Sequence, residues 1–160
     1  MRPVPTAQVL SIIHEFEGKG GTFEATRTYD PSGNPEIGYG HKLTGPEDPL
    51  WFATLDQDHA DALALEDVSK AAQGVCSALG SVVMALTDNE YAALICFAFN
   101  VGVQAFATST MCHLIETGDL EGAGEQFPRW VHEKINGIET IELGLVRRRA
   151  AELALWNTPE

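Results

Sequence analysis

The sequence predicts an α+β fold in which one N-terminal helix is followed by a small β element and then by a helical body. Three observations support this. Apolar residues recur at helical spacing over residues 6–17, turn-forming residues separate two short β-prone pieces over residues 27–41, and the pattern is helical again from Thr54 onward. Because these regions are segregated rather than alternating, a parallel α/β sheet is not expected.

The first helix is expected over residues 6–17, with Thr6 as its N-cap. Its apolar residues share one face, namely Val9, Leu10, Ile13 and Phe16. The glycines at positions 18, 20 and 21 end the helix and place Glu17 at its C-terminal end. The dipole of a helix disfavours an ionised carboxylate there, which suits a group that must donate a proton.

Residues 27–41 have the turn residues of a hairpin or small sheet, and Gly38 and Gly40 flank Tyr39 in a pattern that suits close backbone approach beside a cleft. Residues 43–53 are expected to form a loop. The following helical segment runs to about residue 79 and ends at Gly80.

A T-x-x-E capping box, Thr87 to Glu90, precedes an apolar helix over residues 91–99, which we expect to be the buried central helix. Further helices are expected at about 108–116, 119–126 and 143–156. We expect one domain, residues 1–160, with lobes of about 14–53 and 54–160 bridged by the N-terminal helix. A cleft is expected between a small β-containing lobe and a larger, all-helical lobe.

Composition excludes several classes of function. Ten Lys and Arg residues against 23 Asp and Glu give a net charge of −13, which argues against binding to nucleic acid. We find no apolar run of about 18 residues and no secretory leader, so we expect no membrane insertion, synthesis in the cytoplasm and action after release. Cys76, Cys96 and Cys112 have no metal-ligand spacing, and we expect reduced structural thiols.

Three carboxylates are candidates for glycosidic-bond hydrolysis, which needs an acid and a second carboxylate. Glu17 suits the acid, Asp30 suits an ionised partner, and Glu36 follows Asp30 by six residues across the Pro-Ser-Gly-Asn-Pro turn. A hairpin there is expected to bring Glu36 alongside the first two, so that three carboxylates converge on one cleft. Spacing alone leaves a plainer interpretation open. A helix-end Glu is usually a solvated surface residue, and an Asp before Pro usually serves turn geometry.

Three segments carry a resemblance to a known family. The first contains F-E-G at residues 16–18, Tyr29-Asp30, Gly33 and I-G-Y-G-H at residues 37–41. Together with residues 86–110, and with FPRWV (127–131) followed by GLVRRRAAELALW (144–156), it resembles the phage-type lysozymes of glycoside hydrolase family 24.

That resemblance implies a lysozyme-like fold and hydrolysis of the β-1,4 bond between N-acetylmuramic acid and N-acetylglucosamine in peptidoglycan. It implies Glu17 as the general acid, and Asp30 as the carboxylate that directs water or stabilises the oxocarbenium-like state. No metal or organic cofactor is expected, because carboxylates suffice for this reaction.

Two departures from the family pattern concern the second carboxylate. About four extra residues separate Glu17 from Asp30, which leaves Glu24 as a less favoured rival for the acid. Glu36 stands where the family usually has Thr. Our hypothesis is that Glu36 acts as general base or nucleophile. The alternative is a tolerated variant in which Asp30 does that work.

Supporting roles are expected for four further residues. One member of the run Arg147–Arg149, with Arg148 as the candidate, is expected to pair with Glu17 and position it. His41 is a candidate for orienting a carboxylate, lining the cleft or making a structural hydrogen bond. Tyr39 and Phe106 are candidates for contact with saccharide faces, whereas Trp130 and Trp156 are expected in the core.

The resemblance further implies an endolysin that acts as a monomer on glycan strands after holin-dependent release. The acidic charge leaves room for an antibacterial effector carried by secretion machinery. Two rival functions remain open, a non-catalytic wall-binding or structural module and a lytic transglycosylase.

Overall fold

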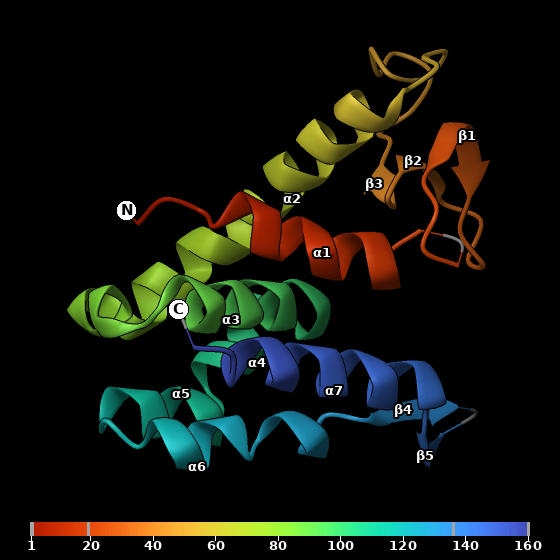
Figure 1. Ribbon diagram of the computed structural model, residues 1–160. Helices are drawn as coiled ribbons and strands as arrows, with labels where there is room; N and C mark the ends of the chain where they lie inside the picture. Colours follow the sequence, from red (N-terminus) through yellow and green to blue (C-terminus); the bar gives the residue numbers. More distant parts are fainter. Residues whose placement is uncertain (1, 19, 136, 160) are drawn as a thin grey trace.

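Helix α3 (Asp88–Val101) is the centre of the fold, and helices α1 (Thr6–Phe16), α2 (Gln57–Leu79) and α7 (Leu143–Trp156) pack around it (Figure 1). The computed structural model describes residues 2–18, 20–135 and 137–159. The ends of the expected domain, residues 1 and 160, therefore lie outside the described residues. The α+β fold class is confirmed.

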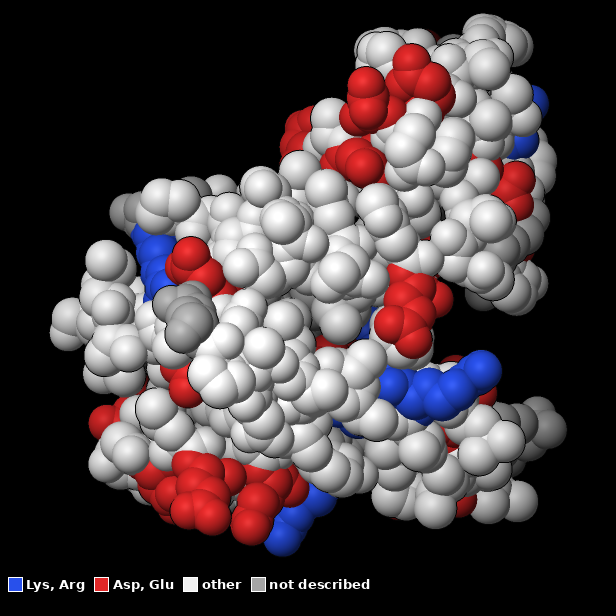
Figure 2. Space-filling model, in the orientation of Figure 1, with Lys and Arg blue, Asp and Glu red and all other residues white. Residues whose placement is uncertain are grey.

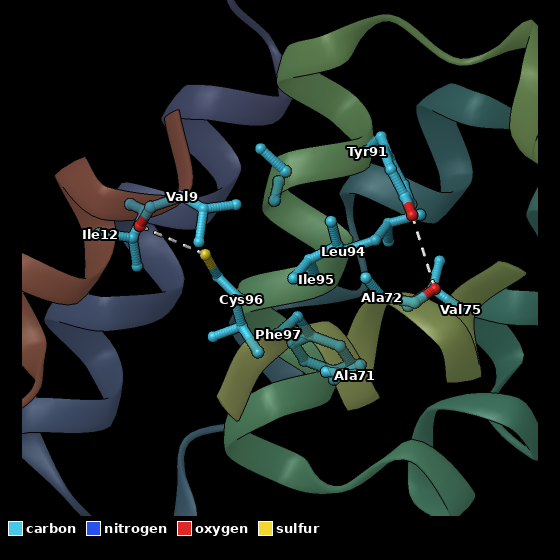
Figure 3. Close-up of a cluster of buried hydrophobic side chains, with 14 of the residues drawn as sticks. Val9, Ile12, Ala71, Ala72, Val75, Tyr91, Leu94, Ile95, Cys96 and Phe97 are labelled. Atoms are coloured by element: carbon cyan, nitrogen blue, oxygen red, sulfur yellow. Dashed lines mark hydrogen bonds between the residues drawn. The ribbon is translucent and has the colours of Figure 1, made fainter. Parts of the chain in front are cut away.

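Local sequence explains why α3 forms and why it is central. The expected capping box is present: the backbone N–H of Glu90 donates to the Thr87 hydroxyl, and the N–H of Thr87 donates to the Glu90 carboxylate. All residues from Tyr91 to Ala98 are buried, so this segment contacts protein on every side. The Cys96 thiol donates to the Val9 carbonyl of α1, and the Tyr91 hydroxyl donates to the Ala72 carbonyl of α2 (Figure 3).

Three short strands form an antiparallel sheet in the order β1 (Glu24–Tyr29), β2 (Pro35–Gly38) and β3 (His41–Lys42). This is the hairpin or small sheet expected from the turn residues. Strands β2 and β3 contact α2, and Figure 1 shows the sheet beside the part of α2 nearest the residue 43–56 connection. Helix α2 begins at Gln57, because the Asp56 side chain accepts from the His59 N–H.

The stretch Gln57–Ala85 is long and apolar enough, by length and composition, to pass as a membrane span. The expectation that no such stretch exists is therefore corrected. Core helices of soluble proteins pass the same test, and about a third of the most apolar window (33%) is buried. α2 also packs against α3 with buried residues that include Val68, Ala72 and Val75.

The remaining elements are short until the last helix. They are the 3-10 turn η1 (Gly80–Ala85), helices α4 (Val103–Ala107), α5 (Thr110–Glu116) and α6 (Leu120–Gly124), the 3-10 turn η2 (Phe127–Arg129), and strands β4 (His132–Ile135) and β5 (Ile138–Ile141). The helices expected near 108–116 and 119–126 are thus confirmed with trimmed ends, the helix at 143–156 is confirmed with its expected bounds, and α4 is an addition.

Two expectations are wrong in detail. Strands β4 and β5 pair antiparallel, so the larger lobe is not entirely helical. β-branched residues on both sides of the Asn-Gly at 136–137 explain this hairpin, because Asn-Gly favours a two-residue turn. Asn136 itself lies outside the described residues. Thr6 is not the N-cap of α1, because Pro5 occupies that position without a side-chain cap.

Candidate active site

Glu17 directly follows helix α1 and makes its last helical hydrogen bond, from its N–H to the Ile13 carbonyl at 2.9 Å. Gly18 then adopts a positive φ of 72°, and a Cβ there would collide with the Thr22 carbonyl oxygen. The chain therefore turns sharply behind Glu17, whose side chain stays 21% exposed. The expected position of Glu17 at the end of the first helix is confirmed.

Arg148 of α7 holds the Glu17 carboxylate. Its Nη1 donates to Glu17 Oε1 at 2.5 Å, its Nε donates to Glu152 Oε1 at 3.0 Å, and its Nη2 donates to the Cys96 carbonyl at 3.2 Å. The expectation that one arginine of the run pairs with Glu17 is confirmed. Arg148 is buried, so its three contacts fix the guanidinium and, through it, one Glu17 oxygen.

The Glu17 side chain lines a cavity of about 370 Å³ between the end of α1 and the start of α7. A second cavity of about 720 Å³ lies between α3, α5 and the β4–β5 hairpin. Asn100, Glu142 and Leu145 line both cavities, so the two adjoin. Figure 2 shows the surface hollowed on the side where the sheet and the β4–β5 hairpin project, with acidic and basic side chains on its walls. The size and position of this hollow suit an extended ligand.

Asp30 lies in the turn after β1, where it is an acceptor for the turn's own backbone. Its Oδ1 accepts from the N–H groups of Ser32 at 2.8 Å and Asn34 at 2.9 Å, and its Oδ2 accepts from Lys42 Nζ at 2.9 Å. The Lys42 ammonium and the Asn34 amide hold the pKa of the Asp30 carboxyl far below its usual range. Asp30 is therefore a fixed, ionised carboxylate.

Glu36 shares its cation with Asp30. Lys42 Nζ donates to Glu36 Oε2 at 2.7 Å, and the two residues are Cα partners in the β2–β3 ladder. The expectation that the hairpin brings Glu36 beside Asp30 is confirmed. Among the described contacts, Glu17 binds Arg148 and not this pair. The described contacts thus divide the carboxylates into two sets, Glu17 with Arg148 and the Asp30–Glu36 pair with Lys42. Contrary to the expectation, no contact among the described residues joins all three.

Lys42 was missed by sequence reasoning, although it organises both carboxylates of the sheet. The strand register that pairs residue 36 with residue 42 would have revealed it. Asn100 was missed as well. The available signal was the Asn-Val-Gly turn at the end of α3, which ends a buried helix at the edge of a cavity.

Tyr39 and Phe106 do not offer a face to a saccharide, so that expectation is wrong. Tyr39 is 8% exposed, its ring stacks on His14 at 5.4 Å, and its hydroxyl accepts from Gln57 Nε2. Phe106 is fully buried (0% exposed) and packs edge-to-face on Phe97. Both aromatic rings are core residues, because their neighbours cover the faces that a sugar would need.

His41 makes the structural hydrogen bond that was one of its expected roles. Its Nδ1 lies 2.9 Å from Asp67 of α2 and ties the sheet to that helix. Glu24 lies in β1 as a Cα partner of Gly38. Trp156 is buried as expected, whereas Trp130 is partly buried, packs edge-on against Phe97 and lines the larger cavity.

Comparison with known proteins identifies the family. The family model described as phage lysozyme matches residues 15–152. An endolysin of Acyrthosiphon pisum secondary endosymbiont phage 1 is 34% identical over 128 residues, which cover 79% of this chain and 82% of that protein. A SAR-endolysin of Escherichia phage Mu is 32% identical over 165 residues, with 94% of this chain and 90% of that protein covered.

Solved structures agree with the family match. The muramidase domain of SpmX from Asticaccaulis excentricus superposes with a TM-score of 0.82 and 30% identity, over 99% of this chain and 100% of that domain. The family match spans both the Glu17 region and the arginine run of α7. The chain therefore belongs to the phage lysozyme family and is a peptidoglycan-lytic, lysozyme-like enzyme.

Proposed function

We propose that this protein is a muramidase, a glycoside hydrolase that cleaves the β-1,4 bond between N-acetylmuramic acid and N-acetylglucosamine in peptidoglycan. One observation carries the proposal: a glutamate at the end of a helix lines a cavity and is held there by a buried arginine. Hydrolysis of such a bond requires a positioned carboxylic acid next to the scissile oxygen.

Glu17 is the general acid in this mechanism. Arg148 contacts Oε1, which leaves Oε2 to carry the proton that the leaving oxygen receives. A guanidinium favours an ionised carboxylate, so Arg148 serves to orient the group rather than to keep it protonated. Orientation matters because proton transfer needs heavy atoms within about 3 Å of each other.

Asp30 and Glu36 have different roles in the proposed mechanism, transition-state stabilisation and general-base catalysis. The lowered pKa of Asp30 makes it a poor proton acceptor and a permanent negative charge, so Asp30 stabilises the oxocarbenium-like transition state. Glu36 has Lys42 as a partner but lacks the turn N–H donors that hold Asp30. Glu36 therefore suits the general base that activates the attacking water, at the position where the family usually has Thr.

Digestion of purified peptidoglycan tests the enzyme proposal. Wild type and Glu17→Gln are compared, and the sugar ends of the products are identified by mass spectrometry. Muramic acid reducing ends that depend on Glu17 are expected. The matched control is Glu116→Gln, because Glu116 is likewise a glutamate at the end of a helix but is exposed outside both cavities, so this change should leave activity unchanged.

Three other outcomes would contradict the proposal. Glucosamine reducing ends would mean a different glycosidase, and anhydro ends would mean a lytic transglycosylase. No Glu17-dependent release would leave a non-catalytic wall-binding module.

For delivery, we propose that the protein is made in the cytoplasm and reaches the cell wall after release from it. The support is that two of the relatives are named endolysins. Release through a holin and action as a monomer are part of this proposal. The test is whether lysis of an expressing host requires a co-expressed holin. Lysis without one would point to export by other machinery.

A further inference from the structure

A single buried carboxylate, that of Glu152, binds two neighbouring arginines of α7, and the first of them, Arg148, also lines the cavity beside Glu17. Glu152 is fully buried (0% exposed), and the i,i+4 and i,i+3 spacings of α7 put Arg148 and Arg149 within reach of it. Arg148 Nε donates to Glu152 Oε1 at 3.0 Å, and Arg149 Nη2 donates to the same oxygen at 3.1 Å. One side chain therefore sets the position of two guanidinium groups.

The contacts of Glu152 with the two arginines form a network with two arms. The first arm runs from Glu152 through Arg148 to the acid, Glu17. Arg148 connects Glu152 to Glu17, and its Nη2 is anchored on the Cys96 carbonyl of α3. Because Arg148 is buried, it has no alternative partner in water if Glu152 is removed. The position of Glu17 therefore depends on Glu152 through one intermediate residue.

The second arm runs from Glu152 through Arg149 to Asn100, and Asn100 lines both cavities. Arg149 Nη2 donates to Asn100 Oδ1 at 2.7 Å. Arginine has only donors, so the amide oxygen must face Arg149, and the amide NH2 is turned away from it. This fixes the amide orientation at the junction of the two cavities and leaves its N–H groups as donors for an acceptor oxygen of a glycan.

The four ionisable groups of this network are matched in number. Two guanidinium groups, those of Arg148 and Arg149, face two carboxyl groups, those of Glu17 and Glu152. The Arg149 guanidinium also lies over the Phe97 ring, 4.9 Å from its centroid, which fixes it against α3. Burial raises the pKa of Glu152 to about 7, while the two guanidinium groups oppose that rise. Removal of Glu152 would leave two buried positive charges facing one carboxylate.

We propose that Glu152 is a positioning residue that orients two cleft groups at once, the acid Glu17 through Arg148 and the substrate-binding amide of Asn100 through Arg149. This inference rests on the proposed glycosidase function and names two residues, Glu152 and Asn100, that it adds to the reaction.

The test compares Glu152→Gln with Ala151→Gly. The second variant weakens the same helix at the neighbouring position without touching the ion pairs. Both are assayed on soluble glycan strands, well below their unfolding midpoints. We expect kcat to fall by about 100-fold in Glu152→Gln, because a displacement of about 1 Å at a catalytic group has that effect. Ala151→Gly should stay within about twofold of wild type, as expected for a change away from the site.

Measurements of binding affinity test the arm that leads to Asn100 separately from the arm that leads to Glu17. In a Glu17→Gln background, which removes turnover, calorimetry measures affinity for a soluble N-acetylglucosamine–N-acetylmuramic acid oligomer. Glu152→Gln and Asn100→Ala should each weaken binding by about tenfold, roughly the value of one hydrogen bond. The double variant should be no weaker than Asn100→Ala alone, because both changes remove the same contact.

A third readout is independent of activity. Side-chain NMR should show shifted Asn100 amide and Arg148 and Arg149 Nε–H signals in Glu152→Gln, and unshifted signals in Ala151→Gly. Should Glu152→Gln fail to fold, Glu152→Asp, which keeps the negative charge but draws the carboxylate back by one methylene, takes its place in every assay.

Two results would overturn the inference. One is wild-type kcat and affinity in a folded Glu152 variant. The other is strict additivity of the Glu152→Gln and Asn100→Ala effects on binding, which would mean that Glu152 does not act through Asn100. Failure of the proposed function would look different, because wild type itself would then release no Glu17-dependent products while the NMR comparison would still report on the network.

Discussion

The carboxylate of Glu17 and the carboxylates of Asp30 and Glu36 are held by different means. Glu17 is held by a buried arginine that is itself bound to a second buried carboxylate. Asp30 and Glu36 share one lysine, whose side chain is 57% exposed, and Asp30 is also held by the N–H groups of its turn. The acid is thus fixed by packing and charge balance, whereas its partners are fixed by local backbone geometry. Mutations in the contacts of Glu17 should therefore affect the stability of the fold, whereas mutations around Asp30 and Glu36 should mainly affect catalysis.

Arg148→Met is expected to have the largest effect, because it leaves Glu17 and buried Glu152 without their shared cation. The free energy of unfolding should fall by about 3–5 kcal/mol, the usual result when one partner of a buried ion pair is removed. Peptidoglycan digestion should fall by about 100-fold or more. Urea unfolding and product release measure the two effects, with the exposed Lys70→Gln on α2 as the control. A stability within 1 kcal/mol of wild type would contradict this account.

Glu36→Gln should affect activity with little change in folding, because Glu36 pairs with a largely exposed lysine. Loss of a general base typically slows a reaction by about 100-fold or more. Near-full activity would mean that Glu36 is a tolerated variant and that Asp30 also directs water. The anomer of the first product, measured by NMR, sharpens the result: inversion indicates a water-activating base and retention a nucleophile.

Lys42→Met should have the smallest effect, on the titration of Asp30. The Lys42 ammonium is the main cause of the lowered Asp30 pKa, so its loss should move that pKa up toward 3.8. Because the pKa is depressed in the folded protein, ionised Asp30 stabilises the fold above about pH 4, and this contribution is lost as the pH falls toward the depressed pKa. In Lys42→Met the folded-state pKa of Asp30 lies closer to its unfolded value, so the pH range over which this contribution is lost should narrow. Carboxyl NMR titration measures the shift, and an unchanged Asp30 signal would assign the lowered pKa to the turn alone.

Local rules predicted much of this fold and only part of the site. The capping box before α3, the glycines after Glu17 and the turn residues around Gly33 act over a few residues, so they are legible in the sequence. The pairing of Arg148 with Glu17 joins residues 131 positions apart. That pairing was expected from charge and family resemblance rather than from any local pattern.

The features that were missed depend on three-dimensional register. Lys42 binds both Asp30 and Glu36 only because one strand register places it opposite Glu36. Tyr39 and Phe106 were misjudged because the sequence does not show whether an aromatic ring near the cleft is covered by its neighbours. The β4–β5 hairpin is the exception, since its Asn-Gly pair is a local signal that was available.

The position of Cys96 gives the molecule a built-in chemical reporter. Its carbonyl accepts from Arg148 and its thiol contacts Val9 of α1, so it lies where the helix carrying the acid meets the ion-pair network. Burial raises the pKa of this thiol and keeps the reactive thiolate scarce in the closed state. Alkylation of Cys96 therefore requires α1 to separate from α3. The alkylation rate measures how often this local opening occurs at the contact that positions Glu17.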